Sequence, residues 1–598
     1  MQAVFARRVL LALALALAPG VPGSAAAASS ADEAFARLAA DFLEDLPVLS
    51  PVGATAVGDH RHDHLLDEVD AAARERQLRL YRRYLERLAA IERDTLSRAS
   101  QVDAELLRAH AEAGIWNIET LQEWAWNPLY YVNLAGSSVY ALMARDFAPL
   151  AERLESAAAR LEQFPRFFRQ ARSQLDPARV PRIHAETAAQ QNRGVLSIVD
   201  AMVQPEAESA PPELRTRLED AIAAAREAVE EHQRWLEERL LPAARGEFRI
   251  GEALFEAKLR HTLHSPLKRR EIRRRAEAEY ERVRQEMYRL AKEVYRRKHP
   301  YTSFPDAADE AYKQAVTRAA LEEAYRRLPE RDAIVDVARD TLLQATDFVR
   351  ASGLVSVPDD PIEIIVMPEF QRGVAVAYLD PPGPLDEGQK SFYAVAPLPE
   401  EWSEEQVQSF LREYNMYSIH NLTLHEAMPG HYLQLALSNR YPSTLRAALW
   451  SGPFVEGWAV YAERVMMDAG YLDGDPLMRL INLKWYLRTV TNAIIDQAIH
   501  VDGMSREAAM RLMIEGAFQE EREAAGKWVR AQLTSTQLST YFVGYQEHAD
   551  MRTAAETAWG SDFSLRRYHD RALSYGSPPV QYVRALLLNE PIPQAPLP

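Results

Sequence analysis

His425, Glu426 and His431 lie on a predicted helix with the sequence Ser418-Ile-His-Asn-Leu-Thr-Leu-His-Glu-Ala-Met-Pro-Gly-His-Tyr-Leu-Gln434. The zinc-hydrolase motif His-Glu-x-x-His spaces its histidines by four residues, which puts both imidazoles on one helix face. Here the spacing is six residues, and on a straight helix this turns the second imidazole about 120° away from the first. A Pro-Gly pair lies between them, and such a pair disturbs helical geometry. We therefore predict a local bulge that swings His431 back toward His425. Two ordinary histidines around a helix kink are the alternative.

Phe454-Val-Glu-Gly-Trp-Ala-Val-Tyr-Ala-Glu463 is the second motif with candidate chemistry, and its Glu456 lies 25 residues after His431. Helical zinc peptidases commonly take a third ligand, a glutamate, from the next helix at such a distance. Two histidines and one carboxylate leave a fourth zinc position open for water. Glu463 stands seven residues after Glu456 and shares its helix face, where it would orient a ligand histidine. A surface acid on an amphipathic helix is the alternative for Glu463.

The composition of the chain excludes several classes of function. The 598 residues are 47% hydrophobic and 26% charged, which is typical of a globular protein. The formal net charge of −16 argues against a nucleic-acid partner and against anchoring on anionic lipid. Cysteine is absent, so the sequence offers no disulfide, thiolate metal site, cysteine nucleophile or lipid-modified cysteine.

The N-terminus has the pattern of a cleaved secretory signal peptide, predicted to span residues 1–28. Arg7 and Arg8 precede an apolar run, Val9–Ala18, and small residues follow from Ser24 to Ala28. The run is shorter than the roughly 20 apolar residues that a transmembrane helix needs. We therefore predict a periplasmic or secreted protein without a stable membrane anchor.

Apolar residues recur at helical spacing through most of the remaining chain, which predicts a mainly α fold. The proline-rich segment 205–212 predicts a boundary between an N-terminal helical region, residues 29–204, and a catalytic helical region, residues 213–598. Within the second region, three short β-rich runs predict a small antiparallel sheet at about residues 360–397. These runs are Ile362–Met367, Gly373–Tyr378 and Ser391–Ala396.

The two motifs, His425-Glu-Ala-Met-Pro-Gly-His431 and Glu456-Gly-Trp-Ala-Val-Tyr-Ala-Glu463, together resemble those of the bacterial domain of unknown function 885 (DUF885) family. The resemblance implies a large, helix-rich, metallopeptidase-like fold that encloses a deep cleft, with zinc and peptidase-like chemistry. Further stretches extend it over about residues 32–590: Pro51–His60, Tyr541-Phe-Val-Gly544 with Arg552, and Tyr568-His569-Asp570 with Gly576 and Pro578. The chain departs from the family pattern at Ala498, where glycine is expected between Asp496 and His500, and at Asn492, where a basic residue is expected.

The ligand set predicts a mechanism. One zinc ion per chain would be held by His425, His431 and Glu456, and would lower the pKa of its bound water toward ~7. Glu426 is the predicted general base, which accepts the proton of the attacking water and passes it to the leaving amine of a peptide substrate. The oxyanion then needs hydrogen-bond donors besides the metal.

Aromatic and histidine side chains outside the two motifs are candidates for the remaining roles. Tyr541, His500, Tyr545 and His569 are the candidate oxyanion donors, of which we take Tyr541 and His500 as catalytic residues. Tyr378, Tyr545 and His569 are the predicted substrate-binding residues. Gly373–Tyr378 is a predicted edge strand that pairs with extended substrate backbone, with a simple structural hairpin as the alternative.

Other interpretations stay open at this point. Gly58-Asp-His-Arg-His-Asp-His64 is a rival metal cluster, although a loop at a helix entrance also explains it and is favoured. The chain could instead be a zinc hydrolase of a non-peptide amide or ester, or a non-catalytic helical binding protein with a degenerate metal site. Arg488, Arg552 and Arg566 are candidates for holding a substrate terminus. The sequence predicts neither exo- nor endopeptidase action, nor side-chain preference, physiological substrate or oligomeric state.

Overall fold

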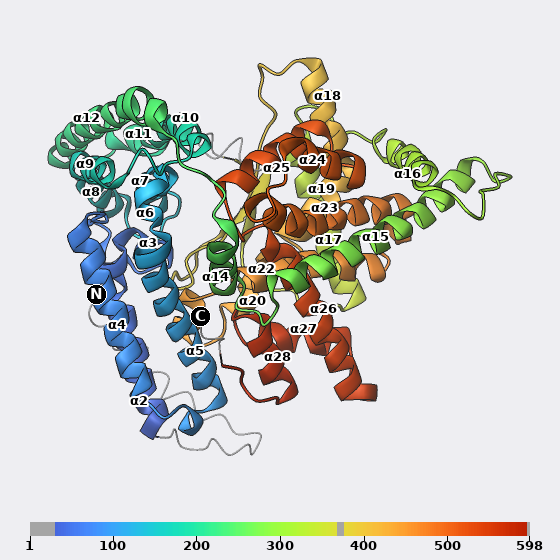
Figure 1. Ribbon diagram of the computed structural model, residues 1–598. Coiled ribbons are helices and arrows are strands. Elements are labelled where there is room, and N and C mark those ends of the chain that lie inside the picture. The colour runs from blue at the N-terminus through green and yellow to red at the C-terminus, as the bar shows by residue number, and fades with distance from the viewer. Residues whose placement is uncertain (1–29, 368–375, 595–598) are drawn as a thin grey trace.

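The computed structural model of the protein describes residues 30–367 and 376–594, which form a mainly helical molecule with one small sheet (Figure 1). Helices make up 72% of the structure and strands 3%, which confirms the predicted mainly α fold. The predicted signal peptide, residues 1–28, lies outside the described residues. Among the described residues, none of the helices combines the length and the apolar composition that a membrane span needs. The deep cleft implied by the family resemblance stays a prediction.

The N-terminal helices bury one large core, which spans Val52 to Ala244, and a smaller one beside it. Phe164, Phe167 and Phe168 are fully buried in the large core. They recur at helical spacing, so they share one face of their helix. The helices are α2 (Ser30–Leu49), α3 (Pro51–Ala56), α4 (Ala71–Ala89), α5 (Arg98–Trp116), α6 (Glu123–Trp126), α7 (Pro128–Met143), α8 (Leu150–Leu161), α9 (Phe164–Gln174), α10 (Arg182–Ile198), α11 (Gln204–Ala207), α12 (Pro212–Trp235) and α13 (Leu241–Ala243).

Most of the remaining helices build a second core, in which α22, α23 and α26 pack directly against one another, and α24 and α25 pack with the end of α23 in a smaller cluster. Helix α16 and the C-terminal end of α15 extend away from the body of the molecule (Figure 1). The helices are α14 (Gly251–Leu263), α15 (Arg269–Lys298), α16 (Glu310–Ala324), α17 (Ile334–Ser352), α18 (Glu404–Glu413), α19 (Met416–Glu426), α20 (His431–Ser438), α21 (Thr444–Ala448), α22 (Gly452–Asp468), α23 (Pro476–His500), α24 (Arg506–Arg511), α25 (Glu521–Leu533), α26 (Ser539–Trp559), α27 (Leu565–Leu573) and α28 (Val580–Leu588).

Helix α12 packs with the N-terminal helices, and this differs from the predicted boundary. Pro212, at the end of the segment expected to be a linker, is the first residue of α12, where proline starts a helix instead of ending one. Leu218 on α12 is buried in the same core as α8 and α9. The two main cores therefore divide between Ala244 and Phe255, and not between the predicted regions 29–204 and 213–598.

The sheet has three strands in the order β1 (Ile362–Val366), β3 (Ser391–Val395) and β2 (Ala377–Asp380). It is mixed, which corrects the expectation of an antiparallel sheet: β2 runs antiparallel to β3, but β1 runs parallel to it. The direction of the chain reverses from β1 to β2 and again from β2 to β3, so β1 and β3 point the same way and pair in parallel. Residues 373–375 of the predicted run Gly373–Tyr378 lie outside the described residues.

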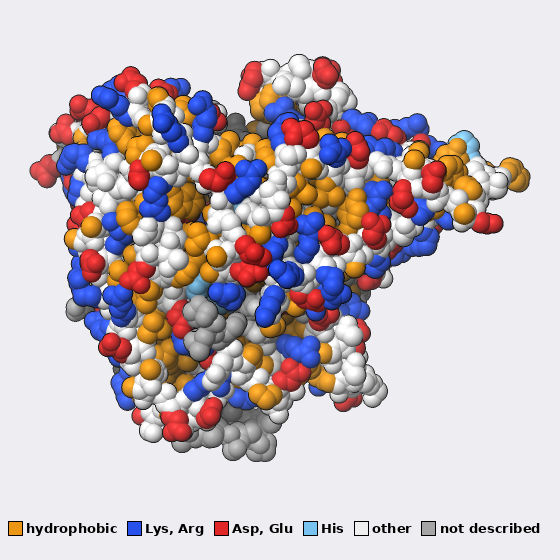
Figure 2. Space-filling view, in the orientation of Figure 1, with side chains coloured by type: hydrophobic (Ala, Val, Ile, Leu, Met, Phe, Trp, Pro, Cys, Tyr) orange, Lys and Arg blue, Asp and Glu red, His pale blue; other side chains and the backbone are white. Residues whose placement is uncertain are grey.

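Helix α15 shows how charge and burial divide on the long helices. Ile272, Val283 and Met287 face the core and are fully buried. Arginines and glutamates pair along the solvent side, as Arg282 does with Glu279 over 2.7 Å. Figure 2 shows the same mixture of basic and acidic side chains across the visible face of the molecule. The charge-rich sequence of α15 therefore needs no partner outside the chain.

Ion pairs join the N-terminal helices to the second region. Arg446 of α21 is fully buried, and its Nε donates to a carboxylate oxygen of Asp103 on α5 over 2.6 Å. Arg145 lies 3.0 Å from the carboxylate of Asp380 at the end of β2. Because removing one partner of a buried pair leaves an uncompensated charge, the Arg446–Asp103 contact fixes how the two regions meet.

The histidine-rich loop Gly58–His64 is a second clamp between the regions. Nδ1 of His60 lies 2.9 Å from the carboxylate of Asp63, and Nε2 lies 2.9 Å from that of Asp386. The ring also stacks on Phe147, with centroids 3.6 Å apart. Both ring nitrogens are engaged, and the loop contributes to no metal-binding group found in the described part of the chain.

The clamp predicts a pH-dependent contribution to stability. Burial alone would lower the pKa of His60, but the hydrogen bonds to Asp386 and Asp63 outweigh it and raise the pKa to about 9. A group with a raised folded-state pKa stabilises the fold fully below its unfolded pKa of about 6.5, and this stabilisation is lost as the pH rises through about 9. His60→Gln should therefore lower the free energy of unfolding most below about pH 6.5, and least above about pH 9, as measured by urea denaturation.

His62→Gln is the matched control for this measurement. His62 lies in the same loop, and its ring makes no side-chain hydrogen bond to any described residue, so this variant should show no such pH dependence. A His60→Gln effect that stays constant across the pH range would contradict the clamp.

Candidate metal centre

Two separate helices, and not one bulged helix, carry the motif histidines. Helix α19 ends at Glu426, one residue after His425, and α20 begins at His431. The predicted bulge is therefore a complete break between two helices. A new helix can start in a new direction, so a spacing of six residues no longer separates the imidazoles, and their ring centroids lie 4.7 Å apart.

Gly430 allows the chain to turn between the two helices. A Cβ atom at this position would lie 1.8 Å from the backbone oxygen of His425 and 2.4 Å from that of Leu424, so only glycine fits. Trp458 of α22 holds the same turn, because its Nε1–H donates to the backbone oxygen of Pro429 over 2.9 Å. The Pro-Gly pair of the first motif and the tryptophan of the second therefore form one structural unit.

His425, His431 and Glu456 converge on one point. Oε2 of Glu456 lies 3.6 Å from Nε2 of His425 and 3.5 Å from Nε2 of His431. Ligand atoms of a tetrahedral zinc ion, each about 2.0–2.2 Å from the metal, lie roughly 3.3–3.5 Å from one another. Both the spacing and the donor set of two imidazoles and a carboxylate fit Zn²⁺. No other group of three such side chains was found in residues 30–367 and 376–594.

Glu463 holds His425 in the orientation that metal binding needs. Its Oε1 accepts a hydrogen bond from Nδ1–H of His425 over 2.7 Å, which leaves Nε2 of the imidazole free to bind a metal. Its Oε2 accepts from the side-chain amides of Asn421 and Asn482, at 2.8 and 3.3 Å. Glu463 is buried, and it links α19, α22 and α23 through these contacts.

A close contact between α22 and α26 determines where Glu456 lies. A Cβ atom on Gly457 would lie 2.3 Å from the backbone of Gly544, and one on Gly544 would lie 2.0 Å from the backbone oxygen of Pro453. The two helix backbones touch here because neither glycine has a side chain to hold them apart. Tyr541 stands one turn before Gly544, so the contact brings it toward Glu456.

Glu426, the predicted general base, lies between the metal ligands and the sheet. Its Oε2 accepts a hydrogen bond from the backbone N–H of Leu379 over 3.0 Å. Leu379 belongs to β2, which lies at the edge of the sheet. Burial raises the pKa of Glu426, and this outweighs the charges of His431 and His425, which lower it. A carboxyl group with a raised pKa at such a position suits proton transfer.

Burial and neighbouring charges oppose one another at the ligands. Burial alone would raise the pKa of Glu456, but the imidazoles of His425 and His431 outweigh it and lower the pKa. Burial alone would lower the pKa of His425, but the carboxylates of Glu456 and Glu463 outweigh it and raise the pKa well above its usual value. Because an imidazole must be neutral to bind a metal, binding here is expected to release protons.

Tyr541 is the predicted oxyanion donor that lies toward the ligands. Its hydroxyl oxygen accepts a hydrogen bond from Nη2 of Arg530 over 3.1 Å. Burial and the charge of Glu456 raise the pKa of Tyr541 to about 12. The hydroxyl therefore keeps its proton at neutral pH and can donate it in a hydrogen bond.

His500 has a different environment from the one predicted. It is the last residue of α23 and is buried, and its Nε2–H faces the backbone oxygens of Ala531 and Thr534 at 2.8 and 2.7 Å. Asp496, one turn earlier, accepts a hydrogen bond from the backbone N–H of Ser539 at the start of α26. Both side chains hold the turn that leads into α26, so His500 supports that helix and does not lie with the ligands.

Tyr545 and His569, predicted to bind substrate, pack into the helical core. The ring of Tyr545 lies 4.6 Å from that of Tyr486. His569 is buried, where its Nδ1–H donates to the backbone oxygen of Leu354 and its Nε2 accepts from the hydroxyl of Tyr461 over 2.9 Å. Tyr545 therefore packs α26 against α23, and His569 packs α27 against α22.

Tyr378 is the predicted substrate-binding residue that the structure brings beside the site. It lies on β2, paired with Ala394 of β3, and directly precedes Leu379, whose N–H binds Glu426. The edge of the sheet therefore runs past the predicted base.

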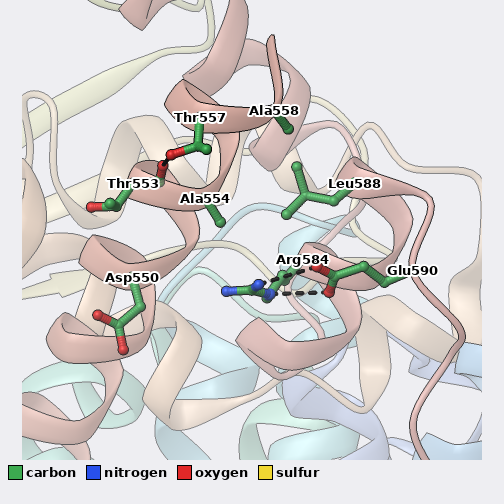
Figure 3. Close-up of a pocket in the computed structure, with 8 residues that line it drawn as sticks. All are labelled: Asp550, Thr553, Ala554, Thr557, Ala558, Arg584, Leu588 and Glu590. Atoms are coloured by element: carbon green, nitrogen blue, oxygen red, sulfur yellow. Dashed lines mark hydrogen bonds and ion pairs between the residues drawn. The ribbon is translucent and has the colours of Figure 1, made fainter. Parts of the chain in front are cut away.

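A surface pocket between α26 and α28 lies elsewhere on the molecule (Figure 3). Arg584 and Glu590 form an ion pair in it, at 3.0 Å. Its lining contains none of the candidate residues: Asp550, Thr553, Ala554, Thr557, Ala558, Arg584, Leu588 and Glu590. This pocket therefore contributes nothing to the candidate centre.

Sequence reasoning missed the two asparagines that complete the hydrogen bonds of Glu463. Asn421 stands four residues before His425 on the same face of α19, and this spacing is the signal that could have identified it. Asn482 lies 19 residues after Glu463 on another helix, and no spacing rule connects them. The N–H of Leu379 is a backbone group, which a search by side-chain type cannot find.

The fold and the site define a helical protein with a two-histidine, one-carboxylate centre beside a further glutamate. Residues 51–587 match the profile of a family described as a bacterial protein of unknown function, DUF885. The chain belongs to this family. A search of curated proteins finds no match to it.

Two solved structures are similar to the chain. A candidate lipoprotein of unknown function from Shewanella oneidensis is 33% identical, with a TM-score of 0.78, and the match covers 94% of this chain and 100% of that one. A candidate lipoprotein from Colwellia psychrerythraea is 18% identical, with a TM-score of 0.75, and the match covers 93% and 98% of the two chains. At that identity, the second likeness shows the fold alone.

The turn at Gly430 predicts that Gly430→Ala abolishes stoichiometric zinc binding. The added methyl group would collide with the backbone of His425 and displace His431 from its partner ligands. Zinc content measured by mass spectrometry after equilibration with the metal tests this. Gly526→Ala on α25 is the control, because a Cβ atom there meets no other atom within 4 Å, and it should bind zinc as the wild type does. Full zinc content in Gly430→Ala would contradict the proposed role of the turn.

Proposed function

We propose that this protein is a zinc-dependent hydrolase that cleaves peptides. The observation that supports it most is the convergence of His425, His431 and Glu456, with the carboxyl group of Glu426 alongside. A structural zinc site is closed by four protein ligands, whereas three protein ligands leave one position for water or substrate. A glutamate beside such a position has a use in catalysis and none in a closed site.

The chain's own residues account for the proton transfers and the charge stabilisation. A zinc ion held by the three ligands would polarise the substrate carbonyl and activate water. Glu426 takes the proton of the attacking water and returns it to the leaving amine, and the N–H of Leu379 keeps its carboxyl group oriented. Tyr541 donates a hydrogen bond to the oxyanion that develops on the carbonyl oxygen. Arg530 holds that hydroxyl in place.

The position of strand β2 favours a peptide as substrate. The strand is an edge of the sheet, and an extended peptide can add to such an edge through backbone hydrogen bonds. Because Leu379 on this strand contacts Glu426, a peptide bound there would lie near the base. A panel of peptides, chromogenic amides and esters separates this proposal from hydrolysis of a non-peptide substrate. A non-catalytic binding protein would hydrolyse none of them.

We also propose that the protein is exported. Residues 1–28 have the charge and apolar pattern of a signal peptide, and the similar structure from Shewanella oneidensis comes from a protein described as a candidate lipoprotein. This sequence contains no cysteine, so export with a cleaved signal peptide, and not a lipid-modified cysteine, is the form proposed for it.

Glu426→Gln should lower kcat for peptide hydrolysis by about 10²–10⁴-fold, which is the usual contribution of a general base. Zinc content should stay the same, because Glu426 is not among the three ligands. Glu405→Gln, an exposed glutamate on α18, is the control and should keep both zinc and rate. A wild-type rate in Glu426→Gln would contradict the assignment of the base.

A further inference from the structure

We propose that Arg488, Lys527 and Arg530 form a subsite that binds a carboxylate group of the substrate. Arg488 lies on α23, and Lys527 and Arg530 lie on α25. The three are called the basic subsite below. The inference rests on the proposed peptidase function, because it names a chemical feature that the substrate must carry.

The basic subsite lies beside the candidate metal centre. Arg530 donates to the hydroxyl of Tyr541 over 3.1 Å, and Tyr541 is placed near Glu456 by the backbone contact between Gly457 and Gly544. Burial lowers the pKa of Arg530, but its hydrogen bond with Tyr541 and the charge of Glu456 outweigh it and raise the pKa. The ligand carboxylate of Glu456 is therefore within electrostatic reach of the subsite.

Among the described residues, the ion pair within this cluster joins Glu523 to one of its three cations, Arg488. Lys527 stands three residues before Arg530 and four residues after Glu523. Glu523, Lys527 and Arg530 therefore lie on one face of α25. Glu523 pairs with Nη2 of Arg488 across to α23, and it also accepts a hydrogen bond from the hydroxyl of Tyr414 over 3.2 Å. The cluster thus carries more basic groups than acidic ones, in a largely buried location.

Two of the basic groups have hydrogen-bond donors that the protein does not use. Lys527 is 5% exposed, and its ammonium group makes no hydrogen bond or ion pair within the described part of the chain. Nη1 of Arg488 is buried and has no hydrogen-bond partner among the described residues either. Leaving a buried hydrogen-bond donor unsatisfied costs free energy, so the free donor of Arg488 and the ammonium group of Lys527 are available to a ligand.

The electrostatics of Lys527 point to an anionic ligand. Burial and the charges of Arg488 and Arg530 lower the pKa of Lys527 well below its usual range. A bound anion would counter both cationic neighbours and restore the charge of the ammonium group. By contrast, the other two arginines considered from the sequence are more exposed and already paired, Arg552 with Glu556 at 2.8 Å and Arg566 with Asp570 at 3.8 Å.

A carboxylate is the anion that a peptide supplies. It occurs at the C-terminus and on aspartate and glutamate side chains, and guanidinium and ammonium groups bind it through charge-assisted hydrogen bonds. The subsite would therefore select peptides with a free C-terminus, as a carboxypeptidase does, or peptides with an acidic side chain near the scissile bond. These two sources share one chemistry and are separated by experiment.

Three acetylated tetrapeptides test the inference: tetra-alanine with a free C-terminus, its C-terminal amide, and the same amide with one alanine replaced by glutamate. Binding is measured by calorimetry on zinc-loaded Glu426→Gln protein, and kcat/KM is measured on the zinc-loaded wild type. A peptide with the required carboxylate should bind about tenfold or more tightly than the neutral amide. Preference for the free acid identifies the C-terminus, and preference for the glutamate amide identifies the side chain.

Lys527→Met is the variant that removes the ligand contact while keeping the bulk of the side chain. Introduced alone and with Glu426→Gln, it should abolish the preference and leave the affinity for the neutral amide unchanged. Arg522→Gln is the matched control on the exposed side of α25, where Arg522 stacks on Trp402 at 4.0 Å, and it should keep the preference. The comparison of peptides on protein with an intact subsite remains decisive if Lys527→Met fails to fold.

The outcomes separate this inference from the proposed function. Equal binding of all three peptides, or no binding of any, would overturn the basic subsite. Hydrolysis of the three peptides at equal rates would leave the peptidase proposal standing and overturn the subsite. A carboxylate preference in binding, with no hydrolysis by the wild type, would support the subsite and count against the peptidase proposal.

Discussion

The close approach of Gly430 to the backbone oxygens of Leu424 and His425 is the constraint on which the candidate centre depends. No side chain fits at this position, so the chain can end one helix and begin the next within four residues. The imidazole of His431 returns to that of His425 only because a new helix starts at His431. The Pro-Gly pair therefore compensates for a histidine spacing that one continuous helix could not use.

A few direct contacts connect the turn at Gly430 to helices α22 and α26. Trp458 donates to the backbone of the turn, and Gly457 beside it allows α22 to touch α26 at Gly544. These contacts set the positions of Glu456 and Tyr541 relative to the turn. Substitution of one of these glycines should thus displace both Glu456 and Tyr541, because close-packed helix backbones transmit a displacement to their neighbours.

The buried polar side chains in and beside the centre differ in how fully the protein satisfies their hydrogen bonds. Glu463 has hydrogen-bond donors on both oxygens, from His425, Asn421 and Asn482, and such a satisfied network fixes side-chain orientation. Nη1 of Arg488 is buried and has no hydrogen-bond partner among the described residues, and Lys527 beside it is 5% exposed, which is the arrangement expected where a ligand completes the network. Glu463 thus orients a metal ligand, whereas Arg488 and Lys527 have the character of groups that bind substrate.

Chemical type and spacing in the sequence predicted the mainly α fold and the residues that the structure brings together, His425, His431, Glu456 and Glu426. Contacts between distant segments set the features that could not be predicted. His500 and His569 have the right chemistry, but their helices turn them toward backbone carbonyls of the core. The parallel pairing of β1 with β3 depends on which strand lies between the others, which local pattern does not encode.

Helix α12 was misassigned for a related reason. Its entrance is rich in proline, which marks both linkers and the first turns of helices. Only the burial of residues such as Leu218 against the N-terminal helices distinguishes the two cases.

The zinc content of the purified wild-type protein, compared with that of His431→Ala, tests the central claim most directly. The account predicts one tightly bound zinc ion per wild-type chain and its loss in the variant, with the helical content unchanged by circular dichroism. A folded, metal-supplemented wild type without zinc, or a His431→Ala variant that binds zinc as tightly as the wild type, would contradict it.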